Sequence, residues 1–506
     1  MTSDTNPLEK RIKRQIHGKT HRFVAIAPLG FEETLVQELK NFKIEGAAFK
    51  VIADGKVEFN TKLAEAWKAV AYSRIANRVL MEIGAFNATN FGQLEKKIAE
   101  IPWELYLFNA ECRMRNAECR MQNFVEASET AELARALPSR SQNECEALMR
   151  NAELISGTNS VDNACSFNIH VSCKHSRLYH SDAIAERVLP LICSRLQDFG
   201  IEDGLDDNGT AGPQNLYIDF VDDRCTLWLD LAGEELYKRG HERFVAEAPL
   251  KETIAAAMIF EGTKIAGAES TGKILIIDPM AGSGTFSLEA AYMANGLIPG
   301  MCRDFALKHQ PGFKEATWKH ICSQFTIHNS KCTMENEESH FQTKCCKSSN
   351  VIASPSGRGN LLKILTSDIS ERAINIIRHN MEHCPLAEIA PEAIQPQLKD
   401  FFCYNFEEIA SSNSCPVLIL LNPPYGKRLN FDAPTLYSKI GKFLNDALRK
   451  NGYSQAKGIH VAILAPKGEC RENLLRECAL LNPAKNDAAK EIKTSHGGIS
   501  LSALFC

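Results

Sequence analysis

The chain has 506 residues, of which 44% are hydrophobic and 24% are charged, which is typical of a globular protein with several domains. Its formal net charge of −4 excludes the strongly basic character of many nucleic-acid-binding proteins, so any such binding has to come from local patches. No apolar run is long enough to cross a bilayer, and the first residues lack the apolar core of a signal peptide. We therefore expect a cytoplasmic protein without membrane contact.

The N-terminal part of the chain predicts a basic tail and a small α+β unit. Residues 1–20 are polar and rich in lysine and arginine, which favours a flexible tail. Residues 21–62 predict a strand, a turn at Pro28–Gly30, a helix and the short alternating strand Lys56–Asn60. Apolar residues at helical spacing predict a further helix over Leu63–Leu80.

A second α+β unit is predicted for residues 63–235. Within it, residues 109–164 contain the motif NAECRM twice in direct succession, which indicates an insertion without a packed core of its own. After the insertion, the pattern predicts a strand from Phe167 and an amphipathic helix over Asp182–Leu196. Two strands follow, and the turn at Asp222–Arg224 predicts that they form a hairpin.

The remaining residues, 236–506, predict a third domain that carries the parallel sheet. Near-continuous apolar runs alternate with helical patterns, as in a parallel sheet with helices on both faces. The four strands that this pattern predicts are Lys273–Pro279, Ile364–Asp368, Val417–Pro423 and His460–Pro466. The polar stretch 322–360 indicates a surface insertion. The fold class predicted for the whole chain is α/β, with a Rossmann-like domain behind two α+β units.

The first predicted strand runs into a glycine-rich motif, DPMAGSGTF, at Asp278–Phe286. The two glycines let a ligand approach the backbone, and a helix that begins near Thr285 directs free N–H groups at that ligand. The motif matches neither a dinucleotide fingerprint nor a P-loop, and a tight strand–helix turn is the alternative. A carboxylate at the strand tip repels phosphate but suits the ammonium group of S-adenosylmethionine. The residues expected to hold this cofactor here are Asp278, Met280, Gly282, Gly284 and Thr285.

Two more carboxylates follow at the predicted strand ends. Asp368 closes the second strand, and a carboxylate at that place can accept both ribose hydroxyls. Asp400 can accept from an adenine amine, and Phe401 can pack on the adenine ring. Taken alone, each aspartate reads as a helix N-cap or a solvated loop residue. Their order behind the glycine motif favours the role of ligands.

The third run, LILLNPPYGKRL, ends on Asn422, Pro423, Pro424 and Tyr425. The prolines lack N–H groups and cannot continue a central strand. The side-chain oxygen of Asn422 and the carbonyl of Pro423 can accept hydrogen bonds from one exocyclic amine, which positions its nitrogen for attack on a methyl group. Tyr425 offers a face on which a flipped base can stack. We expect these four residues to form the catalytic site; a proline-terminated loop is the alternative.

These motifs resemble a known family. DPMAGSGTFSLEAA together with LLNPPYGKRL resembles the amino-methylating class I RNA methyltransferases. YKRGHERFVAEAPLKETIAAAMI extends the resemblance upstream, SRLYHSDAIAERV is similar to a THUMP domain, and FVAIAPLGFEETLVQELK is similar to the ferredoxin-like unit that precedes it. Together they resemble the bacterial 23S ribosomal RNA guanine-N2 methyltransferases.

The resemblance implies S-adenosylmethionine as the methyl donor and a guanine N2 amine of 23S ribosomal RNA, or of a large-subunit precursor, as the acceptor. No metal ion is expected, and the oligomeric state is left open. Two alternatives are the same reaction on transfer RNA and an RNA-binding protein with an inactive methyltransferase fold. DNA adenine methylation shares the Asn-Pro-Pro-Tyr chemistry, but the THUMP-like region favours RNA. The basic residues expected to contact RNA are Lys174, Arg177, Arg239, Arg243 and, near the RNA or cofactor entrance, Lys251.

Overall fold

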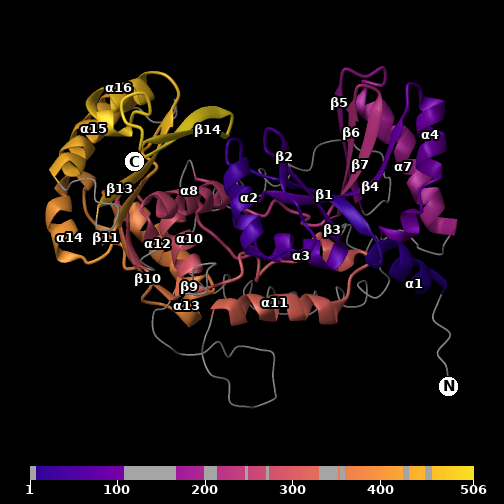
Figure 1. Cartoon of the computed structure of the whole chain (residues 1–506), viewed down its shortest axis with the longest axis horizontal. Helices are drawn as coiled ribbons and strands as arrows, with labels where there is room; N and C mark the ends of the chain where they lie inside the picture. The colour runs from indigo at the N-terminus through magenta and orange to yellow at the C-terminus, as the bar shows by residue number, and fades with distance from the viewer. Residues whose placement is uncertain are drawn as a thin grey trace, which may run out of the picture. The chain divides into compact units, whose positions relative to one another are not determined.

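In the computed structural model, the chain folds into two compact units (Figure 1). The first unit comprises residues 1–16, 82–233 and 305–313, and the second comprises residues 17–81, 234–304 and 314–506. The residues that the structure describes are 7–107, 167–198, 214–245, 249–268, 273–329, 352–353, 359–425, 432–450 and 458–506. The predicted insertion at 109–164 and most of the one at 322–360 lie outside these residues. The predicted domain boundaries stay predictions.

No helix in the described ranges combines the length and the apolar character that crossing a membrane requires.

The first unit is built on the strand order β4-β7-β6-β5. Its strands are β5 (Phe167–Lys174), β6 (Gln214–Val221), β7 (Arg224–Asp230) and the end of β4 (Arg78–Asn87). β6 and β7 are antiparallel, and Asp222 and Asp223 between them have φ values of 51° and 63°, as a two-residue hairpin turn requires. The predicted hairpin is therefore confirmed. The helical segments of this unit are α1 (Pro7–Ile12), α4 (Phe91–Ala99), η2 (Trp103–Leu105), α7 (Ser181–Asp198) and η3 (Ala306–His309).

Part of the predicted flexible tail is helical. Residues 7–17 form α1 and the short π-helix η1 (Lys13–His17), and Ile16 is buried. The Arg11 guanidinium lies 2.6 Å from a carboxylate oxygen of the buried Glu104. The prediction of a flexible tail is wrong for these residues, because one apolar side chain and one ion pair with a distant segment stabilise them. Composition alone cannot show such long-range partners.

The second unit begins with a small antiparallel sheet in which β3 pairs with both β2 and β1. These strands are β1 (Thr20–Ile26), β2 (Lys50–Ala53) and β3 (Lys56–Lys62), and β1 also pairs with the first residues of β4. The helices α2 (Glu32–Asn41) and α3 (Leu63–Tyr72) contact this sheet. The turn before α2 lies against the strand β14 described below: a Cβ on Gly30 would lie 2.2 Å from the carbonyl oxygen of Lys493.

The helix predicted over residues 63–80 is wrong in its second half. Helix α3 ends at Tyr72, and β4 begins at Arg78. The buried carboxylate of Glu38 accepts hydrogen bonds from the Ser73 hydroxyl and from the backbone N–H of Arg74, at 2.6 Å and 2.8 Å. These bonds hold the chain in an extended conformation where the apolar spacing would have continued the helix.

The large sheet of the second unit has the strand order β11-β10-β8-β12-β13-β15-β14, with β9 paired to β10. The first five are parallel, whereas β15 is antiparallel to both neighbours. Their bounds are β8 (Lys273–Asp278), β9 (Ile352–Ala353), β10 (Gly359–Asp368), β11 (Gln397–Leu398), β12 (Val417–Leu421), β13 (Ile459–Pro466), β14 (Lys490–His496) and β15 (Ile499–Phe505). All four predicted parallel strands are present, and the α/β fold is confirmed.

Helices cover both faces of this sheet, with α8, α10 and α12 on one side and α14, α15 and α16 on the other (Figure 1). All five residues of β12 are buried, as expected for a central parallel strand. The bounds of the helices are α8 (Glu252–Ile265), α10 (Thr285–Ala294), α11 (Glu315–Asn329), α12 (Glu371–Glu382), α13 (Leu386–Ile389), η4 (Phe401–Cys403), α14 (Phe406–Ser412), α15 (Ala433–Lys450), α16 (Glu469–Glu477) and η5 (Ala479–Leu481).

Candidate active site

A cavity of about 540 Å³ lies at the carboxyl ends of β8, β10 and β12. Open parallel sheets bind ligands at this edge, because the loops that leave the strands converge there. The predicted catalytic residues all line the cavity: Asn422, Pro423, Pro424 and Tyr425. So do most of the predicted cofactor residues, namely Met280, Gly282, Thr285, Asp368, Asp400 and Phe401. Asp278 and Gly284 are not among the lining residues.

The two glycines of the motif serve different purposes. Both have positive φ, 57° at Gly282 and 79° at Gly284. A Cβ on Gly282 would meet nothing within 4 Å, so this position leaves the cavity open. A Cβ on Gly284 would lie 3.1 Å from a side-chain carbon of Ile377, so this glycine allows α10 to pack against α12. Gly282 is the glycine that gives a ligand access to the backbone.

Asp278 is fully buried behind the cavity wall. One of its oxygens accepts hydrogen bonds from the backbone N–H and the hydroxyl of Ser287, at 3.2 Å and 2.7 Å. Burial raises the pKa of Asp278 to about 7, against the lowering effect of Ser287 and with a further increase from the charge of Asp368. The carboxyl group thus stabilises the first turn of α10. Its other oxygen is buried and has no hydrogen-bond partner among the described residues, so the predicted contact with an ammonium group stays a prediction.

Asp368 lies at the cavity and holds the glycine loop. One carboxylate oxygen accepts from the backbone N–H of Gly282 and the other from that of Ser370, both at 2.9 Å. A carboxylate has about four lone-pair sites, so acceptors remain for hydroxyl groups of a ligand. The geometry is compatible with the predicted ribose contact.

The predicted adenine end of the cavity is built differently from the expectation. Asp400 lines the cavity while its side chain accepts from the backbone N–H of Phe402 at 3.0 Å and caps η4. Phe401 is only 2% exposed, and its ring centroid lies 4.9 Å from that of Phe443 in the core. Ile369 also lines the cavity and is 71% exposed, so it offers the larger apolar surface to a ligand. Ile369 is not among the residues predicted from the sequence, although its place directly after Asp368 was a usable signal.

The Asn422–Tyr425 segment presents an unpaired acceptor. The side-chain oxygen of Asn422 is buried and has no hydrogen-bond partner within the described ranges. The hydroxyl of the buried Tyr437 donates to the carbonyl of Leu464 at 3.0 Å and lies 3.4 Å from the carbonyl oxygen of Pro423. Burial raises the pKa of Tyr425 to about 12, so its phenol stays neutral at physiological pH. The segment therefore offers hydrogen-bond acceptors and a neutral aromatic ring.

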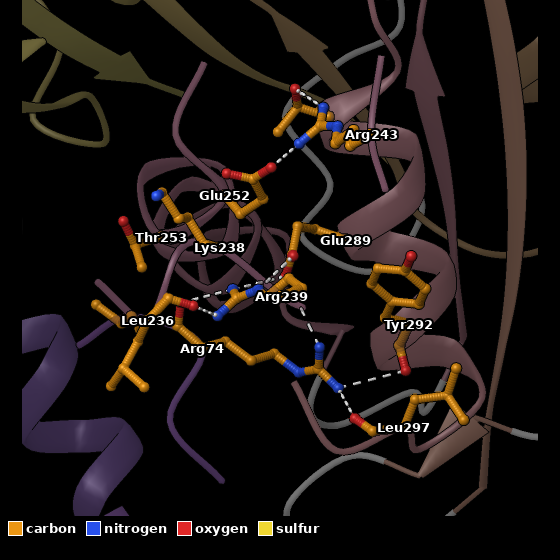
Figure 2. A network of polar contacts seen from close by, with 12 residues as sticks. Arg74, Leu236, Lys238, Arg239, Arg243, Glu252, Thr253, Glu289, Tyr292 and Leu297 are labelled. Atoms are coloured by element: carbon orange, nitrogen blue, oxygen red, sulfur yellow. Dashed lines mark hydrogen bonds and ion pairs between the residues drawn. The ribbon is translucent and has the colours of Figure 1, made fainter. Parts of the chain in front are cut away.

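Arg239 is buried and cannot contact RNA. Its side chain is 3% exposed and forms a bidentate ion pair with Glu289 of α10, with N–O distances of 2.9 Å and 3.1 Å (Figure 2). It also donates to the carbonyl oxygens of Leu236 and Arg74, at 2.9 Å and 3.0 Å. Arg74 in turn lies 3.7 Å from Glu289 and donates to the carbonyl of Leu297. The basic sequence pattern could not reveal this, because the acidic partner is 50 residues away.

The other predicted basic residues differ in exposure. Arg243 is partly buried: 11% of its side chain is exposed, and its guanidinium contacts Glu252, Ser283 and Thr285. Lys251 is partly exposed, lies 3.3 Å from Glu235 and stands 4.5 Å above the ring of Tyr237. In the first unit, Lys174 and Arg177 are exposed, which is compatible with an RNA contact.

Further cavity residues went unnoticed in the sequence. Pro249 and Leu250 come from the segment before α8, while Ser283 and Arg372 flank the predicted residues of the glycine loop and of Asp368. Within the described ranges, no group of three or more histidine, cysteine, aspartate or glutamate side chains is placed to hold a metal ion.

Comparison with known proteins gives two family matches. Residues 239–464 match the family described as RMKL-like, methyltransferase domain. Residues 22–80 match the family described as RlmL ferredoxin-like domain. The first match contains the whole cavity, and the second contains the small antiparallel sheet with α2 and α3.

Individual relatives are similar over most of the chain. The ribosomal RNA large subunit methyltransferase K/L of Syntrophotalea carbinolica is 26% identical over 91% of this chain and 53% of its own length. This chain thus spans about half the length of the curated relatives of that name. YpsC of Bacillus subtilis, provisionally named an RNA methyltransferase, is 24% identical over 81% of this chain and 80% of its own length.

The solved structure of SMU.472 superimposes on this protein with a TM-score of 0.62 at 20% identity. SMU.472 is provisionally assigned as a methyltransferase, and its structure is a complex with SAH. The superposition covers 96% of this chain and 98% of that one, and it shows a common fold. Along this chain, a segment that matches the RlmL ferredoxin-like domain therefore precedes one that matches the RMKL-like methyltransferase domain.

Proposed function

We propose that this protein transfers a methyl group from S-adenosylmethionine to the exocyclic N2 amine of a guanine in 23S ribosomal RNA. The observation that carries the proposal is the buried, unpaired side-chain oxygen of Asn422 in the wall of the same cavity as the glycine loop. A buried acceptor without a donor is costly, so it indicates a ligand that brings an N–H group.

The cavity fits the proposed cofactor. Gly282 leaves space at the backbone, which suits a ligand that lies along the loop. Asp368 retains acceptor sites for the ribose hydroxyls, and the exposed side chain of Ile369 offers an apolar surface to the adenine. When bound, S-adenosylmethionine supplies an electrophilic methyl group. The volume of about 540 Å³ is within the usual range for a ligand of this size.

The reactive groups of the protein position the amine rather than deprotonate it. The side-chain oxygen of Asn422 and the carbonyl of Pro423 accept from the two N–H groups of the guanine amine, which directs its nitrogen at the methyl group. The hydroxyl of Tyr437 contacts the carbonyl oxygens of Pro423 and Leu464 and so helps to hold the Pro423 carbonyl in place. Tyr425 offers its ring to the base, and its raised pKa makes it unsuitable as a base catalyst. The proton that the amine loses after methylation passes to solvent.

The choice of ribosomal RNA follows the names of the relatives, which include ribosomal RNA large subunit methyltransferase K/L. The exposed Lys174 and Arg177 support RNA contact by the first unit.

The test is methyl transfer from labelled S-adenosylmethionine to unmodified ribosomal RNA and transfer RNA in parallel, followed by digestion to nucleosides. N2-methylguanosine from 23S ribosomal RNA alone is the expected product. Label in transfer RNA alone would identify transfer RNA, and not 23S ribosomal RNA, as the substrate. Label on adenine would overturn the assignment of the guanine amine, and cofactor binding without transfer to either RNA or to a precursor particle would contradict the enzymatic role.

A further inference from the structure

Arg243 lies behind the wall of the cavity, where it links three segments of the second unit. One guanidinium nitrogen pairs with Glu252 of α8, as Figure 2 shows. Another donates to the hydroxyl of Thr285 and lies 3.4 Å from that of Ser283. The Arg243 side chain is only 11% exposed, whereas Ser283 and Thr285 both line the cavity. The hydrogen bonds of Arg243 therefore reach the cavity wall through these two hydroxyl groups.

The direction of these hydrogen bonds determines what the hydroxyls offer. A guanidinium group donates hydrogen bonds and accepts none, so both hydroxyl oxygens act as acceptors toward Arg243. Each hydroxyl has one proton of its own, which is then left to donate in another direction. In the described part of the chain, no acceptor for either proton is recorded. The cavity wall thus presents two oriented donors side by side.

The surroundings of these donors suit an anion. Ser283 and Thr285 flank Gly284, the N-cap of α10, and the first N–H groups of a helix have no partner within it. The helix N-terminus carries partial positive charge, and the guanidinium of Arg243, which is paired with Glu252, lies beside it. The Nε atom of Arg243 is buried and without a partner in the described ranges.

We propose that Arg243 is a positioning residue, which turns the hydroxyl donors of Ser283 and Thr285 toward the carboxylate of the cofactor. The inference rests on the proposed function and deepens it, because it assigns the carboxylate to the α10 end of the cavity. It also gives Arg243 a purpose other than the RNA contact that its basic sequence context suggested.

The test compares two ligands by isothermal titration calorimetry on the full chain. S-adenosylhomocysteine carries the carboxylate, and S-adenosyl-3-thiopropylamine keeps the adenosine, the thioether and the amine but lacks it. Because hydrogen bonds to a charged group are among the stronger ones, Arg243→Gln should weaken S-adenosylhomocysteine about tenfold or more. The same substitution should change the affinity for the second ligand by less than about twofold, since the lost donors have no partner there.

Two further variants separate positioning from folding. Thr285→Val should reduce the preference for the carboxylate ligand as Arg243→Gln does, and the double variant should lose less than the sum of the two single losses, because both changes act on the Thr285 hydroxyl. Arg243→Lys should restore part of the preference. Arg378→Gln removes an exposed guanidinium of α12 and should leave both affinities unchanged.

The outcomes distinguish the two levels of the proposal. Failure of the unaltered protein to bind either ligand would contradict the proposed function. Normal binding of S-adenosylhomocysteine together with an equal loss of both ligands in Arg243→Gln would mean that Arg243 is merely structural. If Arg243→Gln does not fold, an unchanged ligand preference in Thr285→Val and Ser283→Ala would overturn the inference.

Discussion

Asn422 offers the most direct test of the chemistry at the scale of single residues. Asn422→Ala removes an acceptor that positions the target amine but leaves the glycine loop and Asp368 in place. We expect methyl transfer to fall by at least about a hundredfold, since positioning contributes several kcal/mol to catalysis. Single-turnover assays measure this loss, and calorimetry with S-adenosylhomocysteine should show an affinity within about twofold of the original. Normal turnover in the variant would remove Asn422 from the catalytic site.

Asp278 predicts a dependence of stability on pH. Its pKa is raised to about 7 in the folded protein, against about 3.9 in an unfolded chain. A raised pKa stabilises the fold most at a pH below the unfolded value, and this contribution is lost as the pH rises through the folded value. The protein should therefore lose stability between about pH 4 and pH 7 relative to the Asp278→Asn variant, which does not titrate.

Thermal unfolding of both proteins across this pH range measures the difference. Parallel curves would show that the carboxyl group is ionised throughout. Placement of Asp278 behind the wall was not predictable from its position at a strand tip, because the direction of the side chain is set by Ser287 in the following helix.

At the scale of elements, the two glycines of the loop between β8 and α10 should affect different properties: one the binding of the cofactor, the other the stability of the fold. Gly282→Ala and Gly284→Ala both introduce strain of about 1–2 kcal/mol, because both residues have positive φ. Gly284→Ala adds a close contact with Ile377 and should lower the free energy of unfolding further. Gly282→Ala places its methyl group in open space at the cavity and should mainly weaken the binding of S-adenosylhomocysteine.

Denaturant unfolding and calorimetry on the two variants test this division, and each serves as the control for the other. The same pattern of losses in both variants would contradict it. The glycine motif itself was evident in the sequence, but the distinct purposes of its two glycines depend on which neighbour faces each Cβ.

The elements that the sequence predicted best are the parallel strands. β8, β12 and β13 are almost entirely buried and consist mainly of apolar residues, and β10 contains the apolar run Leu361–Leu365 broken by Lys363, so local composition was sufficient. The helix expected over residues 63–80 failed because Glu38, a residue far away in the sequence, ends it at Tyr72. Local spacing describes which face of a helix is apolar, but it does not contain the tertiary hydrogen bonds that end a helix.

At the scale of the whole molecule, buried charge limits what a sequence can reveal. The cofactor and catalytic motifs were recognisable because strand order brings successive strand ends to one edge of the sheet. Arg239 and Arg243 were misassigned to RNA contact, since an arginine in a basic sequence context has the same letter whether it is exposed or paired in the interior. The difference lies in Glu289 and Glu252, which only the fold brings close.

The ion pair of Arg239 and Glu289 joins parts of the second unit that are distant in sequence. Arg239→Ala removes the bidentate partner of the buried Glu289 carboxylate and leaves Arg74 at 3.7 Å, and removal of one partner of a buried pair costs about 3–5 kcal/mol. Denaturant unfolding should show a loss of this size, whereas Arg378→Ala on the exposed face of α12 should change stability by less than about 0.5 kcal/mol. A loss below about 1 kcal/mol for Arg239→Ala would contradict a structural role for the pair.

The close approach of Gly30 to Lys493 has a consequence for how the second unit unfolds. Between the turn before α2 and strand β14 there is no room for even a methyl group, so the two sheets meet there backbone to backbone. Thr34 of α2 donates a hydrogen bond to Glu261 of α8, and Lys490 of β14 donates to the same carboxylate. These bonds link the same two regions of the second unit. The two sheets should therefore unfold together in one cooperative transition rather than one after the other.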